Sequence, residues 1–189
     1  FGIELSEAGL FNFFGQFAYE PAQVYAFVCL FMLAASFGLP IPEELTLIAV
    51  GLVANMANHP DLYPPPYPGA EGVNTVTLCI VSFLAVLGSD FVVYMIGKVL
   101  GGRISKTKFF QKQVAGAGFE KSNSWFQKYG GWACGIFRFT PGLRFPGHLS
   151  CGLLGIPVWK FLAVDGTAAL LSVPTQVYVV ATYGRVVLD

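Results

Sequence analysis

The sequence predicts an all-α polytopic membrane protein with two inverted-repeat halves. Each half is a broken re-entrant helical hairpin followed by a transmembrane helix, and amphipathic interfacial helices complete the chain. The first observation is composition, since 54% of the 189 residues are hydrophobic and only 12% are charged, whereas about 25% are charged in an average soluble domain. The second is a pattern that occurs twice, in which two short apolar runs separated by Gly and Pro precede one long apolar run. Such interrupted segments in corresponding halves are typical of transporters with internal repeats.

Residues 1–20 are the first predicted element. Polar side chains recur there at roughly helical spacing among Phe and Leu, which predicts an interfacial helix rather than a membrane span. We expect no cleavable signal sequence in this segment. Because the chain opens on Phe1 and not on Met, we expect a start segment to have been removed or left out.

Residues 21–57 are the first predicted re-entrant hairpin. Two apolar runs lie on either side of a Gly/Pro break, and neither reaches the roughly 20 residues that a membrane-spanning helix needs. Residues 58–72 form a polar, Pro-rich loop that we expect outside the membrane. Residues 73–100 are apolar over a length that allows a tilted crossing, so they are the first predicted transmembrane helix.

The second half repeats this order within what we predict to be a single membrane domain. Residues 101–128 are basic and aromatic, which predicts an amphipathic segment at the cytoplasmic surface. Residues 129–157 contain two short apolar halves around a Gly/Pro break and form the second predicted re-entrant hairpin. Residues 158–185 supply the second predicted transmembrane helix.

The distribution of basic residues predicts the orientation. No Lys or Arg occurs before Lys98, whereas residues 98–128 contain six lysines and one arginine. Basic residues beside membrane spans mark the cytoplasmic side, so residues 98–128 are placed in the cytoplasm. Nucleic-acid binding is the competing interpretation of a basic run, but the aromatic residues among these lysines better suit a helix in the headgroup layer.

Two arginines lie in the second hairpin, beside its break. Arg138 and Arg144 are six positions apart, which on one continuous helix is a rotation of about 600° and would point them in different directions. A break between them allows the two guanidinium groups to converge and to hold a phosphate bidentately. The alternative is that both arginines only neutralise buried carboxylates and hold the hairpins together. The residues expected at the two hairpin breaks are Pro40, Pro42, Pro141, Gly142, Pro146 and Gly147.

Glu43, Glu44 and Asp90 are the predicted proton-coupling residues. Glu43 and Glu44 start the second apolar run of the first hairpin, where the alternative interpretation is an ordinary acidic first helical turn. We expect Glu44 to be the proton carrier and the place-holder on the arginines until the anion arrives. Asp90 is either a second titrating site or a hydrogen-bonding residue in helix packing, and Asp165 has the same two interpretations.

No metal site, cofactor or enzymatic centre is expected. The four cysteines lie in apolar surroundings without metal-like spacing and are interpreted as small buried hydrophobic residues. Two histidines alone, His59 in the Pro-rich loop and His148 just after the arginine motif, do not predict a metal site. His148 is the one candidate base near the arginines, and it is interpreted as a packing or hydrogen-bonding residue.

Three motifs resemble those of the DedA family, also known for the VTT or SNARE-associated Golgi domain. The first is Gly38-Leu-Pro-Ile-Pro-Glu-Glu44 and the second is Gly88-Ser-Asp90 with Tyr94 and Gly97. The third and most specific is Phe137-Arg-Phe-Thr-Pro-Gly-Leu-Arg144, followed by Gly147 and Gly152. The resemblance covers about residues 30–184.

The resemblance implies a multi-pass protein of the bacterial cytoplasmic membrane with two opposed re-entrant hairpins. By motif position, Glu44, Arg138 and Arg144 would take the places of the family's essential acidic and basic residues. Bacterial members are implicated in returning undecaprenyl phosphate across the membrane, so a flippase for carrier-lipid recycling, coupled to protons or sodium ions, is the expected function. Two departures stand out, namely Glu43 where many members have a small residue, and no second carboxylate near Asn55 and Met56.

Two other functions stay open. Eukaryotic relatives in this family scramble phospholipids, and a nonselective scramblase would need a hydrophilic groove but no coupling ion. A membrane scaffold or assembly factor would instead use the basic segment at 98–128 to dock a partner. Homo-oligomerisation is compatible with either function.

Overall fold

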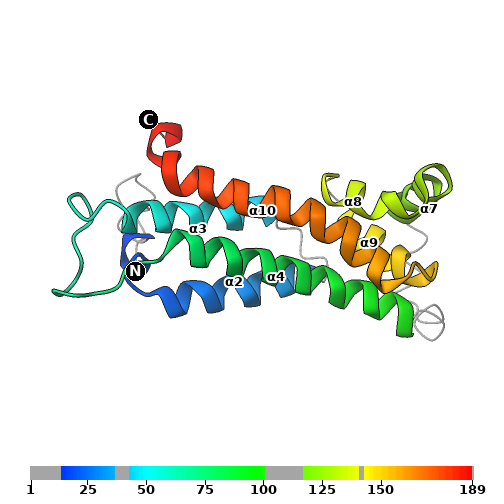
Figure 1. The fold of residues 1–189 in the computed structure, drawn as a ribbon, viewed down its shortest axis with the longest axis horizontal. Helices are drawn as coiled ribbons and strands as arrows, with labels where there is room; N and C mark the ends of the chain where they lie inside the picture. Colours follow the sequence, from blue (N-terminus) through cyan, green and yellow to red (C-terminus); the bar gives the residue numbers. More distant parts are fainter. Residues whose placement is uncertain (1–13, 37–42, 101–116, 141–142, 189) are drawn as a thin grey trace. The chain divides into compact units, whose positions relative to one another are not determined.

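A computed structural model describes residues 14–36, 43–100, 117–140 and 143–188, and these residues form helices and connecting turns without a β-strand (Figure 1). The all-α prediction is therefore confirmed for the described residues. Pro40, Pro42, Pro141 and Gly142 lie outside them, as do most of the predicted interfacial helix and residues 101–116 of the basic segment. In chain order the helices are α2 (Pro21–Ser36), α3 (Glu43–Ala57), α4 (Thr75–Met95), the π-helix η1 (Ile96–Leu100), α7 (Ala117–Tyr129), the 3-10 turn η2 (Gly130–Trp132), α8 (Ala133–Arg138), α9 (Arg144–Leu153) and α10 (Val158–Leu188).

The helix formed by α4 and η1 has the length and composition of a membrane span. Its apolar stretch, Thr75–Val99, contains 25 residues, which at about 1.5 Å per residue exceeds the roughly 30 Å of a bilayer's hydrocarbon core. Val76, Ile80 and Leu84 recur every four residues and are exposed. An exposed apolar stripe of this kind suits contact with lipid tails.

Helix α10 coincides with the second predicted transmembrane helix. It is continuous over 31 residues despite Pro174 in its interior, and its length is sufficient for a crossing. Among the described helices, however, α4 with its extension is the one that is both long and apolar enough for a span. The second crossing and the inverted repeat therefore stay predictions.

The chain divides into two compact units. Unit 1 contains α3, the N-terminal part of α4 through Leu84 and the C-terminal part of α10 from Ser172, and unit 2 contains the segment from Ala85 to Leu171. Helices α4 and α10 each contribute to both units. The prediction of a single membrane domain stays a prediction.

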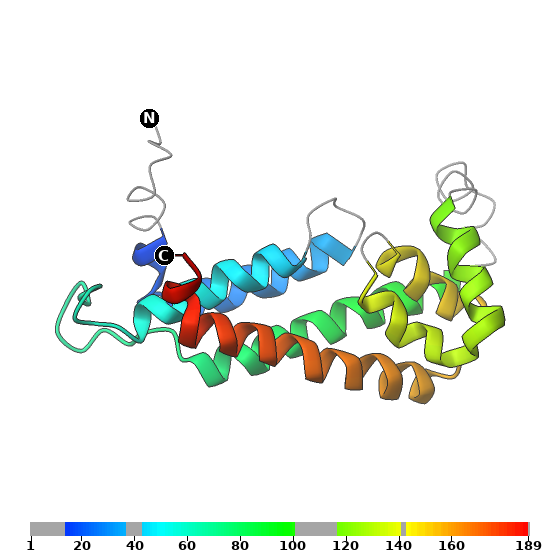
Figure 2. The same cartoon turned by 90° about the horizontal axis from the view of Figure 1, so that it is seen from above.

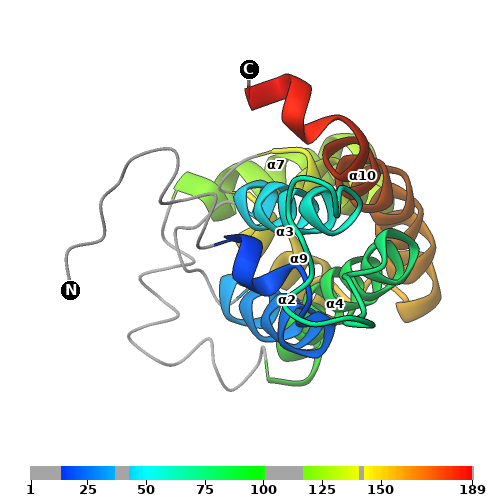
Figure 3. The same cartoon turned by 90° about the vertical axis from the view of Figure 1, so that its left-hand side faces the viewer.

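In unit 1, α3 packs closely on the C-terminal part of α10 (Figures 1 and 3). Gly51 permits the approach, because a Cβ atom there would lie 2.8 Å from the Cβ of Val180. One turn later, Asn55 Nδ2 donates a hydrogen bond of 2.8 Å to the carbonyl oxygen of Ala181. This buried hydrogen bond adds a directional interaction to the contact between α3 and α10.

In unit 2, α9 packs against the C-terminal end of α4, η1 and α8, and α7 lies beside α8 and α9 (Figure 2). Two glycines allow the helix backbones to touch: a Cβ on Gly97 would collide with the carbonyl oxygen of Leu149, and one on Gly152 would collide with that of Tyr94. Tyr94 is fully buried, stacks on Phe161 of α10 at 4.5 Å between ring centroids, and donates a 2.5 Å hydrogen bond to the carbonyl of Ile156. This packing holds α4, α9 and α10 together around the charged residues described next.

Candidate functional site

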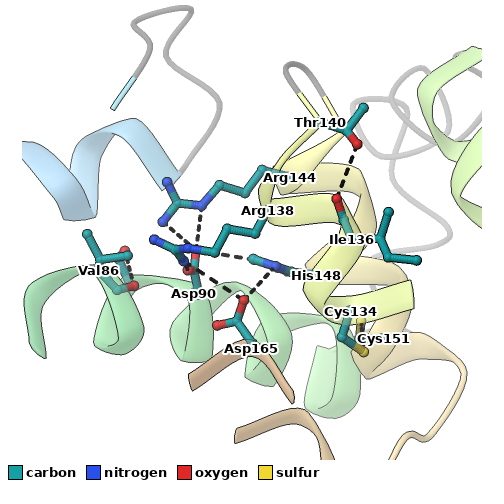
Figure 4. Close-up of polar contacts among 11 residues, drawn as sticks. Val86, Asp90, Cys134, Ile136, Arg138, Thr140, Arg144, His148, Cys151 and Asp165 are labelled. Atoms are coloured by element: carbon teal, nitrogen blue, oxygen red, sulfur yellow. Dashed lines mark hydrogen bonds and ion pairs between the residues drawn. The ribbon is translucent and has the colours of Figure 1, made fainter. Parts of the chain in front are cut away.

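Five ionisable side chains converge inside unit 2 (Figure 4). Asp90 comes from α4 and Asp165 from α10; Arg138 is the last residue of α8, and Arg144 the first of α9, with His148 one turn later. We call these five residues the charged cluster. The sequence places Asp90 inward because Val86, Val93 and Tyr94, at helical spacing from it, share its buried face.

Asp90 pairs with both arginines. Arg138 Nη1 donates a hydrogen bond of 2.8 Å to Asp90 Oδ2, and Arg144 Nε donates one of 2.8 Å to Oδ1. Arg144 Nη2 also lies 2.8 Å from Oδ1. Each carboxylate oxygen therefore faces one guanidinium group, and the two arginines, which the sequence separates by six positions, meet on a single anion.

His148 lies between the two carboxylates of the cluster. Its Nδ1 is 3.2 Å from Asp90 Oδ1 and its Nε2 is 3.3 Å from Asp165 Oδ1. Asp165 Oδ1 is also 3.9 Å from Arg138 Nη1. The imidazole is held edge-to-face against Phe161 at 5.5 Å between ring centroids, so its orientation is determined by packing as well as by charge.

The members of the cluster differ in exposure. The side chains of Asp90, Arg138, His148 and Asp165 are at most 2% exposed, whereas that of Arg144 is 20% exposed. A buried ion pair is costly to desolvate and needs several partners to be stable. Arg144 is thus the member that a ligand from outside can reach first, and Arg138 lies deeper.

Asp90, His148 and Asp165 also have the spacing of a metal site, since one ligand atom of each lies within 4.8 Å of the others. Both oxygens of Asp90 already face guanidinium groups at 2.8 Å. Coulomb repulsion from two nearby cations opposes binding of a metal cation at such a place. The donor set of these residues therefore favours an anion or a proton over a metal ion.

The structure brings together three of the residues predicted to bind phosphate or to couple protons, namely Arg138, Arg144 and Asp90. Glu43 and Glu44 instead begin α3 in unit 1, where Glu44 is exposed. Pro146 and Gly147 lie in the first turn of α9, so the backbone is helical at both positions. Proline is tolerated there because its missing N–H would have no acceptor in the first turn of a helix.

Gly147 has a packing role beside the arginines. A Cβ at this position would lie 2.7 Å or less from the side chain of Phe137, which is fully buried. The glycine therefore lets α9 lie directly on the aromatic ring that precedes Arg138. This contact helps to bring the end of α8 and the start of α9 close enough for both arginines to reach Asp90.

His148 is interpreted from the sequence as a packing or hydrogen-bonding residue, and Asp165 as a titrating or hydrogen-bonding one, so neither is predicted as part of the anion site. His148 follows Arg144 by four positions and so shares its helix face. Asp165 is an acidic residue in an apolar helix, where ionisable groups are functional candidates by default. Both signals were present, but nothing in the sequence indicates that α9 and α10 bring the two side chains together.

The two cysteines of the second hairpin provide a test of its geometry. Cys134 in α8 and Cys151 in α9 are buried, with their sulfur atoms 2.7 Å apart. We expect copper phenanthroline with oxygen, which removes two electrons and two protons from a thiol pair, to join them in an intramolecular disulfide. Mass spectrometry of proteolytic peptides would detect it. A Cys134→Ser variant should lose this cross-link, and absence of the link in the wild-type protein would contradict the α8–α9 contact.

Comparison with known proteins agrees with this description. The VTT domain family profile matches residues 41–182. An uncharacterized membrane protein of Haemophilus influenzae is 29% identical over 170 residues, which cover 89% of this chain and 72% of that protein. The uncharacterized membrane protein YbfM of Bacillus subtilis is 26% identical over 171 residues, 86% of this chain and 90% of YbfM. No solved structure matches at a significant level. The family resemblance is confirmed, and the chain is a membrane protein that belongs to the VTT domain (DedA) family.

Proposed function

We propose that the charged cluster binds the phosphate headgroup of a membrane lipid, and that the protein is a transporter rather than an enzyme. Its substrate would be undecaprenyl phosphate, returned across the bacterial cytoplasmic membrane for carrier-lipid recycling with proton or sodium coupling. The observation that carries this proposal is the convergence of Arg138 and Arg144 on one carboxylate, Asp90.

The geometry of the pairing between the arginines and Asp90 supports an anion site. A carboxylate and a phosphate present oxygens of similar spacing to a guanidinium group, and arginine binds both bidentately. Asp90 therefore occupies the place that phosphate oxygens would take. Helix α9 begins at Arg144, so the positive end of its dipole adds to the attraction of an anion.

Exchange of Asp90 for phosphate on the two arginines gives a reason for transport to be coupled to an ion. When a phosphate takes over the arginines, the Asp90 carboxylate remains buried and loses its two arginine partners, which is costly. A proton or a cation that arrives with the phosphate offsets this cost. We assign the response to the coupling ion to the carboxylates of Glu44, Glu43 and Asp90; Glu44 is exposed at the start of α3.

A site of this size suits a lipid substrate. The two arginines of the cluster carry enough charge to neutralise one small charged headgroup, while a long prenyl tail can remain in the bilayer. Only the headgroup then needs shielding during the crossing.

The test is transport in liposomes that contain purified protein. Translocation of undecaprenyl phosphate and of a zwitterionic phospholipid is measured with and without a pH gradient, for the wild type and for Arg144→Ala. Loss of a charge-assisted hydrogen bond of about 1.5–3 kcal/mol should lower undecaprenyl phosphate transport about 10- to 100-fold. Arg185→Ala, an arginine change near the end of α10, is the matched control and should transport like the wild type.

Three results would contradict the proposal in different ways. Unchanged transport by Arg144→Ala at equal protein content would remove the phosphate role of the arginines. Equal movement of both lipids without dependence on pH would indicate a scramblase. Movement of neither lipid would leave the scaffold function, in which case exchanging the basic segment at 98–128, and not the arginines, should abolish activity in cells.

A further inference from the structure

The positions of the two ring nitrogens of His148 require one more proton than a neutral imidazole supplies. Each nitrogen faces a carboxylate oxygen. Nδ1 lies 3.2 Å from Asp90 Oδ1, and Nε2 lies 3.3 Å from Asp165 Oδ1. A neutral imidazole has one N–H and one lone pair. In that form, one ring nitrogen would direct its lone pair at a negatively charged oxygen. The contacts become attractive on both sides when the ring is doubly protonated, or when one carboxyl group carries the proton.

Asp165 is the member of the cluster that this proton stabilises most. Its side chain is fully buried, and within the described residues neither of its carboxylate oxygens has a hydrogen-bond partner. Its contacts are electrostatic, with His148 Nε2 at 3.3 Å and Arg138 Nη1 at 3.9 Å. A buried carboxylate without hydrogen bonds is unfavourable, so a proton on His148 or on Asp165 itself lowers its cost.

The charges around this proton come from four helices. Asp90 faces it from α4, Arg138 and the Cys134 thiol from α8, Arg144 and the Cys151 thiol from α9, and Asp165 from α10. Two guanidinium groups balance two carboxylates, so the proton makes the charged cluster net positive by one. A net positive, water-poor site attracts an anion. Proton and phosphate therefore favour each other's binding.

We propose that His148 and Asp165 form the proton-binding site that accompanies the lipid phosphate, which deepens the proposed function and rests on it. The proton comes from solution and is held between His148 Nε2 and Asp165 Oδ1. When the phosphate draws Arg138 and Arg144 away from Asp90, the imidazolium remains 3.2 Å from Asp90 and keeps that carboxylate paired. Proton and phosphate leave together, because losing either one makes the other less stable in the site.

The first experiment observes the proton directly. The chain has two histidines, so protein labelled with ¹⁵N-histidine in nanodiscs gives two sets of ring-nitrogen signals. His59→Gln assigns one set and serves as the matched control, since His59 lies in unit 1 with its Nδ1 2.8 Å from the carbonyl oxygen of Asn55. We expect His148 to be doubly protonated at pH 7 in the wild type and in His59→Gln. In Asp165→Asn it should lose the second proton at a lower pH.

The second experiment connects the proton to the lipid. Above the pH at which His148 of the lipid-free protein loses its second proton, one co-bound proton changes the affinity for undecaprenyl phosphate by up to about tenfold per pH unit, with weaker binding as pH rises. Asp165→Asn and His148→Gln should flatten this dependence, whereas His59→Gln should keep it. The titration of the lipid phosphate is the same for all variants. The difference between their slopes of affinity against pH therefore measures the contribution of the protein.

The results separate this inference from the proposed function. A neutral His148 at pH 7 in the wild type, or an unchanged pH slope in Asp165→Asn, overturns the proton site even if Arg144-dependent transport is observed. A doubly protonated His148 whose protonation depends on Asp165 supports the site. If wild-type protein moves no undecaprenyl phosphate, the proposed function fails, and the nitrogen signals alone then decide whether the proton site exists.

Discussion

Replacing Asp90 with alanine is expected to lower the free energy of unfolding by about 3–5 kcal/mol, because it removes one partner of a buried ion pair. The side chain of Arg138 is 2% exposed, and its Nη1 donates a hydrogen bond to Asp90 Oδ2. Without the carboxylate, two guanidinium groups would face each other across a buried space. Asp90→Asn should cost less, since one oxygen still accepts a hydrogen bond. Equilibrium unfolding in mixed detergent micelles measures both changes.

The matched control for this loss is Asp61→Ala. Asp61 is an exposed aspartate in the Pro-rich loop after α3, and a surface substitution of this kind usually changes stability by less than about 0.5 kcal/mol. If Asp90→Ala unfolded like Asp61→Ala, the charged cluster would not stabilise unit 2. The arginines would then have to be balanced by other groups.

The second large effect is expected at the glycines where helix backbones touch. Gly152→Ala in α9 would drive a methyl group into the carbonyl of Tyr94, and would also bring it 2.6 Å from the amide nitrogen of Lys98. Gly97→Ala would meet the backbone of Leu149 in the same way. Backbone cannot move aside as a flexible side chain does, so the cost should reach or exceed the roughly 1–3 kcal/mol of ordinary overpacking.

Gly88→Ala is the control for helix propensity. Gly88 lies in α4, and a Cβ there meets nothing within 4 Å. Alanine is favoured over glycine in a helix by up to about 1 kcal/mol, so this variant should be as stable as the wild type or more so. Thermal stability in detergent distinguishes the three variants. A Gly152→Ala protein as stable as Gly88→Ala would contradict the contact between α9 and the end of α4.

Part of this structure could be predicted from the sequence because the relevant signals are local. The apolar run at 73–100 predicts a long helix, and α4 with η1 covers Thr75–Leu100. Glu43 and Glu44 predict the start of a helix, and α3 begins at Glu43. The convergence of the arginines could also be expected, because a break between two helical segments is the simplest way to direct both to one place.

The remaining features depend on contacts between distant segments. His148 and Asp165 are separated by most of α9, a turn and the start of α10, and no sequence periodicity links them. The pairing of Asp90 with the arginines likewise depends on how α9 crosses α4, which Gly97 and Gly152 permit. Spacing alone left Asp90 with two interpretations, and it is the packing of unit 2 that makes it the partner of both arginines.

The central claim is that the arginine pair binds a lipid phosphate, and native mass spectrometry in detergent tests it most directly. Undecaprenyl phosphate and undecaprenol, which lacks the phosphate, are compared as ligands of the wild type and of Arg144→Ala. We expect the wild type to bind undecaprenyl phosphate at least about tenfold more tightly than undecaprenol, and Arg144→Ala to lose most of this preference. Equal binding of the two lipids by the wild type, or an undiminished preference in Arg144→Ala, would contradict it.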